Sequence, residues 1–563
     1  MRSRFFGMAL YALIAASANA FAQRPAPTAQ RADLIVTNAR IYTVDDNHPF
    51  VEAMAVREGR VTFVGSAREA MLLRDPSTRV VDAGGHTIIP GMVDAHAHLF
   101  ELGEFLHNID LRATRSYEEI VNIIAAHVKE TPSGRWIRGR AWDQNKWGDT
   151  RFPTHEALSR ISPNNPVVLE RVDGHALLAN AAAMRAAGVT AATKDPAGGR
   201  IERNANGEPT GVFVDNAQAL IERVVPPWSH DEMVSLALAG VKEANKYGLT
   251  GVHDPGEPRT VLDVFEELAK ANNLSLRVYA MISDDSAAIE HYFELGPRSD
   301  LYDSHLWIRA IKLYADGALG SRGAALLDPY TDDPKNNGLL KSTPEHLRDV
   351  STRALQHGFQ VATHAIGDRG NRIALDAYEA ALEAVPTVDH RFRIEHVQVL
   401  DHADVPRFAQ LGVIPSMQSV HQTSDMYWAS NRLGYARTFG AYAWRSLLNT
   451  GVILPNGSDM PVERVNPLYS FHAAVSRQDD NNWPPGGWFP EQKMTRDEAL
   501  KSMTIWPAFA GFQEKELGSL TPGKFADFVI LDRDIMTVPD QEILGTSVLA
   551  TYIGGRAVFE RSR

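Results

Sequence analysis

The 563-residue chain contains no cysteine. Disulfides, thiol nucleophiles and thiolate metal sites are therefore excluded, as is lipid attachment to an N-terminal cysteine. The chain also lacks a basic excess, because 57 Lys and Arg stand against 69 Asp and Glu and give a formal net charge of −12. A nucleic-acid partner favours a basic face, so the sequence predicts no nucleic-acid binding. The hydrophobic content of 44% is typical of a soluble globular protein with a large core.

Long apolar runs are also missing after the first residues. Arg2 and Arg4 precede the apolar residues 5–16, and small residues that fit a cleavage site follow them. This order is typical of a secretory signal peptide, here residues 1–22, with an uncleaved anchor as the alternative. The apolar run is short for a membrane span, and no later segment is long and apolar enough to be one. The sequence predicts a periplasmic or secreted protein with no membrane span after cleavage.

Short alternating strands are predicted near both ends of the chain. In residues 32–86, apolar segments such as 34–36 and 53–56 are separated by turn-forming residues. The same pattern returns in residues 516–563, with a predicted hairpin. We expect the two regions to build one small β-sandwich domain from both termini.

The middle of the chain, residues 87–515, alternates strand-like apolar runs with amphipathic helical stretches, a pattern typical of α/β proteins with a parallel sheet. The first run is 87–90, and seven more follow at 250–253, 276–282, 307–313, 359–364, 392–396, 413–417 and 452–455. Eight runs predict a closed (β/α)8 TIM-type barrel, with the active site at the carboxyl ends of its strands. A long insertion, about residues 101–247, follows the first barrel strand, and connections of this length usually form a subdomain or carry function.

Candidate metal ligands fall at the ends of several predicted strands. His96 and His98 are two residues apart, so on a strand both imidazoles leave the same face and are able to bind one ion. Candidates on the fourth, fifth, sixth and eighth runs are Lys312, His364, His396 and Asp459. Each has an ordinary explanation alone, such as a hydrogen-bonded core histidine, a surface lysine or a helix cap. Their joint placement favours a metal site.

Lys312 has a chemical property of its own at this position. It lies within an apolar predicted strand, where a charged ammonium is unfavourable unless it is paired or altered. Desolvation lowers the pKa of a lysine and leaves a neutral amine, which takes up CO₂ to form a carbamate. A carbamate is able to bridge two divalent ions.

Six segments carry a family resemblance, and together they span most of the chain. They are PGMVDAHAH (90–98), KLYADGA (312–318), HAIGDR (364–369), RIEH (393–396), GSDMP (457–461) and GSLTPGKFAD (518–527). The sequence resembles the amidohydrolase superfamily, specifically the amidohydrolase 3 group that includes N-substituted formamide deformylase-like metal-dependent hydrolases.

The resemblance implies a binuclear site, usually with two Zn²⁺ ions that are bridged by a carboxylated Lys312. The ligands that it implies are His96, His98 and Asp459 for the first ion and His364 and His396 for the second. Bound metal lowers the pKa of water, so a metal-activated hydroxide would attack a carbonyl that the second ion polarises. Asp459 would act as general base and acid, taking a proton from the water and passing it to the leaving nitrogen.

Six side chains are candidate substrate contacts: Trp142, Asp173 and His175 on the insertion, Arg322 after the lysine strand, and Gln418 and His421 after the seventh run. Core packing is the alternative for the tryptophan. The sequence thus predicts an enzyme that cleaves the C–N bond of a small amide, N-acyl or N-formyl compound. Lactone, carbamate or cyclic-imide hydrolysis, a deamination, or non-catalytic binding are the alternatives, and the sequence leaves open whether the chain forms a homo-oligomer.

Overall fold

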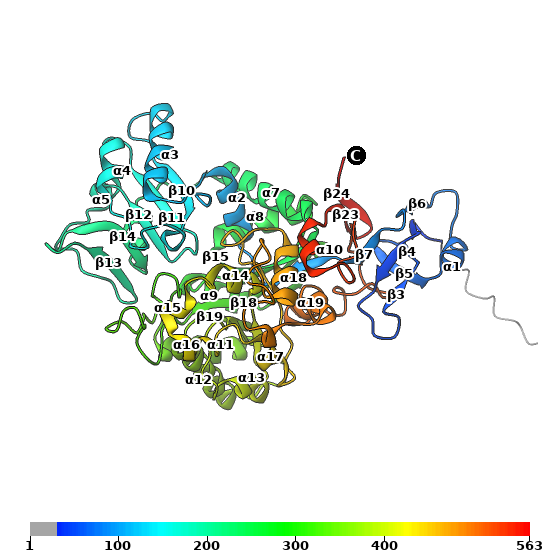
Figure 1. Cartoon of the computed structure of the whole chain (residues 1–563). Helices are drawn as coiled ribbons and strands as arrows, with labels where there is room; N and C mark the ends of the chain where they lie inside the picture. The colour runs from blue at the N-terminus through cyan, green and yellow to red at the C-terminus, as the bar shows by residue number, and fades with distance from the viewer. Residues whose placement is uncertain (1–30, 563) are drawn as a thin grey trace, which may run out of the picture.

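Two small sheets bring the two ends of the described chain together. The computed structural model describes residues 31–562, so the signal peptide expected at residues 1–22 lies outside the described residues. One sheet has the strand order β5-β4-β1-β6, and the other has the order β24-β23-β22-β7-β2-β3. The strands are β1 (Leu34–Thr37), β2 (Arg40–Tyr42), β3 (Phe50–Val51), β4 (Ala53–Arg57), β5 (Arg60–Gly65), β6 (Arg79–Asp82), β7 (Thr87–Pro90), β22 (Phe528–Leu531), β23 (Val548–Ile553) and β24 (Arg556–Glu560). Both sheets lie at the right of Figure 1.

The core of this terminal region combines apolar side chains from both sheets. Val36 and Val56 come from the first sheet, and Ile88, Phe528 and Tyr552 come from the second. The rings of Phe528 and Tyr552 stack with their centroids 4.3 Å apart. The two chain ends therefore depend on each other to bury this apolar surface.

The run expected to open the barrel belongs to the terminal region instead. β7 pairs in parallel with β2 and antiparallel with β22. The parallel sheet begins one residue later, with β8 (Met92–Asp94). Gly91 separates the two strands, and a Cβ there would lie 2.1 Å from the Thr250 Oγ1, so the close approach needs glycine. The expected boundary at residue 87 therefore moves to Gly91.

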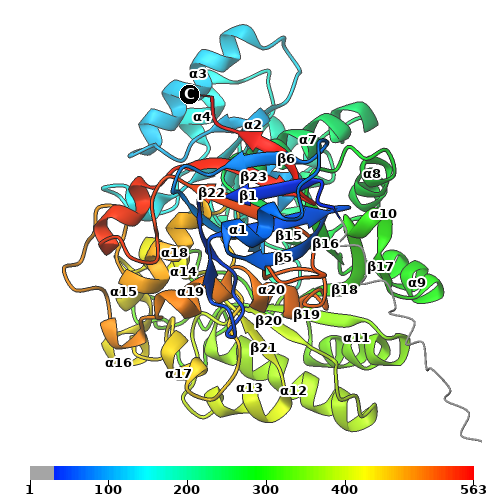
Figure 2. The same cartoon turned by 90° about the vertical axis from the view of Figure 1, so that its right-hand side faces the viewer.

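Seven strands form a curved parallel sheet in the order β21-β20-β19-β18-β16-β15-β8. They are β8, β15 (Leu249–Glu257), β16 (Arg277–Ile282), β18 (Leu306–Tyr314), β19 (Gln360–Ala365), β20 (Arg393–His396) and β21 (Ile414–Ser416). Helices α7 (His230–Lys246), α8 (Arg259–Lys270), α11 (Pro344–His357), α12 (Asp368–Ala384) and α13 (Val405–Leu411) connect them. Figure 2 shows α8, α11, α12 and α13 at the edge of the molecule, outside the strands.

The eighth predicted run, residues 452–455, is not a regular strand. Pro455 has no backbone N–H for a sheet ladder, which explains why pairing is limited to its end. There the Met417 amide donates to the Pro455 carbonyl at 2.9 Å, and the Gly457 amide donates to the Met417 carbonyl at 2.9 Å. On the other side, the Ala95 amide donates to the Asn456 carbonyl at 3.2 Å. This segment thus lies between β21 and the residues that follow β8.

Helix ends follow local sequence signals. α7 begins at a capping box, in which the Ser229 side chain accepts from the Glu232 amide and the Glu232 carboxylate accepts from the Ser229 amide. α11 begins after Thr343 with Pro344 in its first turn and ends at Gly358, whose φ is 78°. These residues set the positions at which the chain returns to the parallel sheet.

The insertion builds a mixed sheet of its own, in the order β13-β14-β12-β11-β10-β9. The strands are β9 (Ile109–Asp110), β10 (Ile137–Trp142), β11 (Val167–Arg171), β12 (Ala176–Ala179), β13 (Gly199–Arg203) and β14 (Pro209–Asp215), with helices α3 (Tyr117–Glu130), α4 (Glu156–Ile161) and α5 (Ala181–Ala187) against them. Figure 1 shows this subdomain on the opposite side of the parallel sheet from the terminal sheets. Within residues 31–562, no helix has the length and apolar character needed to cross a membrane.

Candidate active site

The carboxyl ends of the parallel strands gather the predicted metal ligands. His96 and His98 follow β8 and precede α2 (Leu99–His107), whose N-cap residue is His98. Lys312 lies in β18, His364 lies in β19, and His396 ends β20. Asp459 follows the irregular eighth segment, and its amide donates to the His96 carbonyl at 2.7 Å. Residues far apart in the sequence thus meet at one edge of the sheet.

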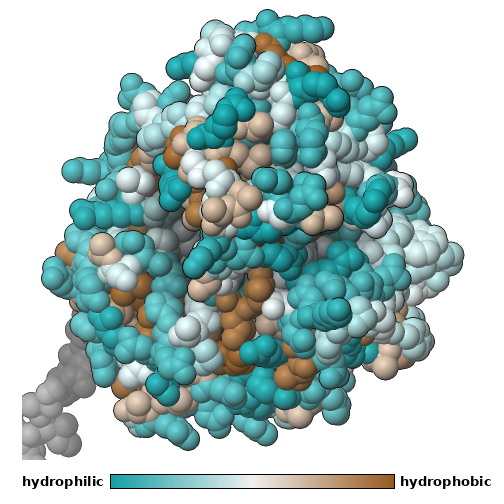
Figure 3. Space-filling model, turned by 90° about the vertical axis from the view of Figure 1, so that its left-hand side faces the viewer, coloured by the Kyte–Doolittle hydropathy of each residue, from teal (hydrophilic) through white to brown (hydrophobic). Residues whose placement is uncertain are grey.

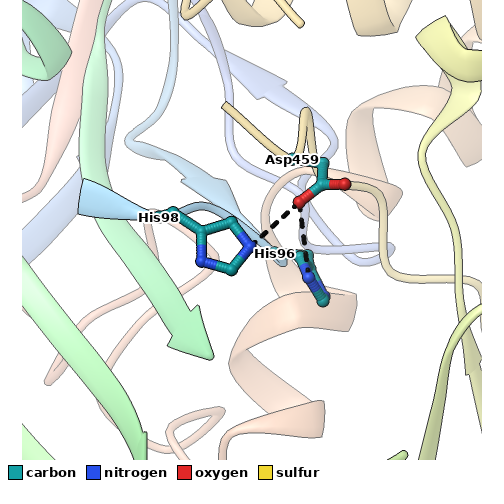
Figure 4. A group of neighbouring side chains, drawn as sticks. All are labelled: His96, His98 and Asp459. Carbon is teal, nitrogen blue, oxygen red and sulfur yellow. Dashed lines mark ion pairs between the residues drawn. The ribbon is translucent and has the colours of Figure 1, made fainter. Parts of the chain in front are cut away.

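One group of donor atoms consists of His96, His98 and Asp459. The Asp459 Oδ1 lies 3.5 Å from the His96 Nε2 and 3.2 Å from the His98 Nε2, the two contacts dashed in Figure 4. The three ligand atoms all lie within 4.8 Å of one another. Two imidazole nitrogens and a carboxylate oxygen are donors that suit Zn²⁺, so the side chains fit a divalent cation.

A second group shares Asp459 with His396 and His421. The Asp459 Oδ2 lies 3.2 Å from the His421 Nε2 and 4.0 Å from the His396 Nδ1. His421, which we expected to contact substrate, lies in α14 (Ser419–Asp425). His364, expected as a ligand of the second ion, is outside both groups. Its ring centroid is 4.5 Å from that of His396, and its Nε2 is 3.5 Å from the Gly317 carbonyl oxygen.

Asp459 and His421 hold each other charged. Burial alone would raise the pKa of Asp459, but hydrogen bonds from His421 and His98 hold it well below its usual range. Burial would lower the pKa of His421, yet hydrogen bonds to Asp459 and Glu463 outweigh it and raise the pKa to about 10. A cation bound by His421 would therefore have to displace a proton.

Lys312 lies next to the first donor group. Its side chain is buried, and its Nζ is 3.2 Å from the His96 Nε2. Burial lowers the pKa of the Lys312 ammonium to about 8, despite the nearby carboxylates of Glu395 and Asp459. The structure therefore brings the predicted lysine to the site in an environment that disfavours its charge.

Glu395 supports the site, and the sequence reasoning did not assign it a role. Its Oε2 is 2.6 Å from the His96 Nδ1, and its Oε1 accepts from the Arg393 Nε at 2.7 Å. Burial alone would raise the pKa of Glu395, but Arg393 and His96 hold it well below its usual range. A charged carboxylate on Nδ1 leaves the Nε2 lone pair facing Asp459. The available signal was its position in the RIEH segment, directly before the candidate ligand His396.

A cavity of about 730 Å³ opens over these residues. Its lining combines site histidines with residues of the insertion, among them His364, His396, Asp459, Asp173, His175 and Arg171. Asp173 receives a hydrogen bond from Arg171 beside the cavity. Figure 3 shows the insertion side of the molecule, which is mostly hydrophilic and hollowed between an upper and a lower part, with hydrophobic residues gathered below the hollow.

Three expected substrate contacts lie away from the described cavity lining. Trp142 is fully buried in the insertion core, and its Nε1 donates to the Leu169 carbonyl at 2.8 Å. Arg322 points to Asp332, with an Nη2–Oδ2 distance of 2.9 Å. Gln418 is buried, and its Oε1 lies 2.6 Å from the His396 Nδ1, so it orients a histidine. The sequence shows the types of these residues but not the groups with which they form hydrogen bonds or ion pairs. Asp173, His175 and His421 do line the cavity.

Comparison with known proteins identifies the family. A sequence model of the amidohydrolase family matches residues 79–559. The chain belongs to the amidohydrolase family. This amidohydrolase is 36% identical to protein LONG AFTER FAR-RED 3 of Arabidopsis thaliana over 94% of its own length and 92% of that protein. It is 29% identical to N-substituted formamide deformylase of Arthrobacter pascens, over 95% of this chain and 99% of that protein.

A solved structure agrees with this assignment. An uncharacterized metal-dependent hydrolase from Pyrococcus horikoshii OT3 matches this amidohydrolase with a TM-score of 0.74 at 27% identity, over 90% of this chain and 99% of that one. The predicted family is therefore confirmed, and the α/β fold with a curved parallel sheet agrees with it. This amidohydrolase is a metal-dependent hydrolase of its superfamily, and the clustered donor atoms support a divalent metal.

Proposed function

We propose that this amidohydrolase hydrolyses the C–N bond of a small amide, N-acyl or N-formyl compound at a site for two divalent cations, with zinc as the expected metal. The observation that carries the proposal is the placement of two donor groups that share Asp459 beneath one cavity. Full-length similarity to an N-substituted formamide deformylase supports the type of bond.

The donor groups suggest which residues would hold the cations. His96, His98 and Asp459 would hold the first, while His396 and Asp459 would contribute to the second, with His421 or the adjacent His364 completing it. We also propose that Lys312 is carboxylated, as the family resemblance implies. An ammonium 3.2 Å from the His96 Nε2 would repel a cation at that nitrogen, whereas a carbamate supplies oxygen donors.

The residues of the site would then have separate roles in the reaction. Divalent cations here would supply Lewis acidity, which makes water nucleophilic near neutral pH and stabilises a developing oxyanion. Asp459 is charged and buried at the shared position, so its carboxylate would accept a proton from the attacking water and deliver it to the leaving nitrogen. Glu395 would hold the His96 ring in one orientation during this exchange.

Two broader features complete the proposal. Residues 452–456 would close the curved sheet into a (β/α)8 barrel, in keeping with the hydrogen bonds on both of their sides.

Residues 1–22 would direct export to the periplasm or the medium. Signal cleavage is tested by determining the N-terminal sequence of the protein recovered from each cell fraction, and an intact Met1 would contradict export by cleavage.

The test of function joins metal analysis with a substrate panel. Purified protein is expected to hold about two zinc ions per chain and to cleave N-acyl or N-formyl amides. A chelator should abolish activity, and added zinc should restore it. The His98→Asn variant should lose bound metal and at least 100-fold in kcat/KM, whereas His107→Asn, at an exposed position of the same helix, should match wild type.

The alternatives give different results in the same assays. Cleavage of lactones, with every amide untouched, would replace the proposed bond type. Folded protein that retains no metal after incubation with zinc would contradict a metal-dependent reaction altogether.

A further inference from the structure

The insertion supplies a second carboxylate–histidine pair to the cavity. His175 lies in the turn between β11 and β12, and its Nδ1 is 2.6 Å from the Oδ1 of Asp215, which ends β14. The Asp215 amide also donates to the His175 carbonyl at 3.0 Å, so backbone and side chain hold the two residues together. Asp215 is buried, whereas His175 lines the cavity. The pair is therefore fixed at its inner end and exposed to the cavity at the other.

The His175 ring faces the residues of the proposed metal site. Its centroid is 5.0 Å from that of His364, which in turn is 4.5 Å from that of His396. The contact with Asp215 has the same length as the one between His96 and Glu395. A carboxylate accepts hydrogen bonds only, so a neutral imidazole paired with it carries its proton on Nδ1 and a lone pair on Nε2.

Two glycines after β18 of the parallel sheet confine the Asp215 carboxylate. A Cβ on Gly317 would lie 2.5 Å from the Asp215 Oδ2, and a Cβ on Gly323 would lie 2.4 Å from the same atom. Neither position tolerates a side chain without displacing the carboxylate. Asp215 is thus confined between the insertion and the loop after β18, which makes it a positioning residue for His175.

We propose that His175, oriented by Asp215, accepts a hydrogen bond from an N–H of the substrate. This inference rests on the proposed function and narrows its substrate class to amides that carry a hydrogen on the scissile nitrogen, such as secondary amides. A tertiary amide or a lactone has no donor at that atom and leaves the His175 lone pair unpaired. Sites built to pair with a donor discriminate against analogues that lack it.

The first test compares a secondary N-alkylformamide with its N-methylated tertiary analogue. Wild-type enzyme is expected to favour the secondary amide by roughly tenfold or more in kcat/KM. His175→Phe should remove this preference while retaining metal. Asp215→Asn should also remove it, because the Asn amide is able to donate to Nδ1 and move the ring proton to Nε2. A preference for the secondary amide of the same size in wild type and in both variants would overturn the proposal.

The second test determines which ring nitrogen of His175 carries the proton, and it does not depend on turnover. Nitrogen-15 NMR of labelled protein, with His175→Phe used for assignment, should show an Nδ1–H tautomer in wild type and the Nε2–H tautomer in Asp215→Asn. An Nε2–H tautomer in wild type would refute the inference. If no amide is cleaved but the Nδ1–H tautomer is found, the proposed function fails while the geometry of the pair stands.

Glycine variants provide a matched comparison. Gly323→Ala should displace the Asp215 carboxylate and weaken the secondary-amide preference. Gly148→Ala, at an insertion position with open space around its Cβ, should leave both the preference and the tautomer unchanged. The same loss in both glycine variants would point to a general disturbance of the insertion and contradict the specific role of Asp215.

Discussion

His96 depends on a residue that does not face the cavity. Glu395 contacts its Nδ1 at 2.6 Å and is held in turn by Arg393. We expect Glu395→Gln to weaken metal affinity by about 10- to 100-fold, because a neutral amide no longer fixes the ring orientation or strengthens the Nε2 donor. Metal titration followed by calorimetry measures this change. Glu383→Gln on the α12 surface is the control, and equal affinities in the two variants would contradict the positioning role of Glu395.

Lys312 gives a prediction about pH and bicarbonate. Burial lowers its pKa to about 8, so the reactive neutral amine dominates above that pH and falls to roughly 1% at pH 6. Metal-free protein kept without CO₂ should therefore regain metal and activity faster when bicarbonate is added, and faster at pH 8.5 than at pH 6. Lys312→Ala should show no bicarbonate effect, whereas the exposed-site variant Lys242→Ala should behave like wild type. Recovery independent of bicarbonate would argue against carboxylation.

For single residues of the site, the sequence predicted the types of the candidate ligands but not the side chains that form hydrogen bonds with them. His96, His98, Lys312, His396 and Asp459 were selected because their types and strand positions suit metal binding, and the structure brings them together. The partnership of Asp215 with His175 joins residues forty positions apart, through a loop packing that no local pattern records. The sequence reasoning therefore found candidate donors and missed the residues that orient them.

Helix α2 shows how an element fixes a ligand. Its N-cap is His98, and it crosses α7 where a Cβ on Gly240 would lie 2.4 Å from the Leu99 carbonyl oxygen. Alanine stabilises an exposed helix by about 1 kcal/mol relative to glycine, but here we expect Gly240→Ala to destabilise the fold by about 1–3 kcal/mol. Thermal unfolding at fixed metal concentration checks the sign. Leu238→Ala, on the exposed face of α7, should have a smaller effect, and a stabilised Gly240→Ala would refute the close crossing.

Strand positions were predicted better than strand partners. The runs at 359–364 and 392–396 coincide closely with β19 and β20, because a buried parallel strand is a local apolar run. β7 is equally apolar, and only its pairing with β2 and β22 assigns it to the terminal sheet. The pairing with β22 joins segments more than 400 residues apart in the chain, which periodicity does not reveal.

At the scale of the whole molecule, a buried ion pair joins the terminal region to the parallel sheet. Arg277 in β16 donates to Asp527, just before β22, with Nε–Oδ2 and Nη2–Oδ1 distances of 2.6 and 3.1 Å. Its guanidinium also lies 3.9 Å from the centroid of the Phe525 ring. The pair lies where the C-terminal segment returns to the sheet, so it links the stabilities of two regions far apart in sequence.

We expect Asp527→Ala to destabilise the protein by about 3–5 kcal/mol, because it leaves the Arg277 guanidinium buried without its carboxylate. The double variant Arg277→Met/Asp527→Leu should recover much of this loss, since it removes the buried guanidinium charge together with the carboxylate that paired with it. Calorimetric unfolding with metal held constant measures both changes. Asp149→Ala, in an exposed pair with Arg151, should leave the midpoint unchanged. A double variant no more stable than Asp527→Ala would show that the junction needs these two side chains themselves, beyond the balance of their charges.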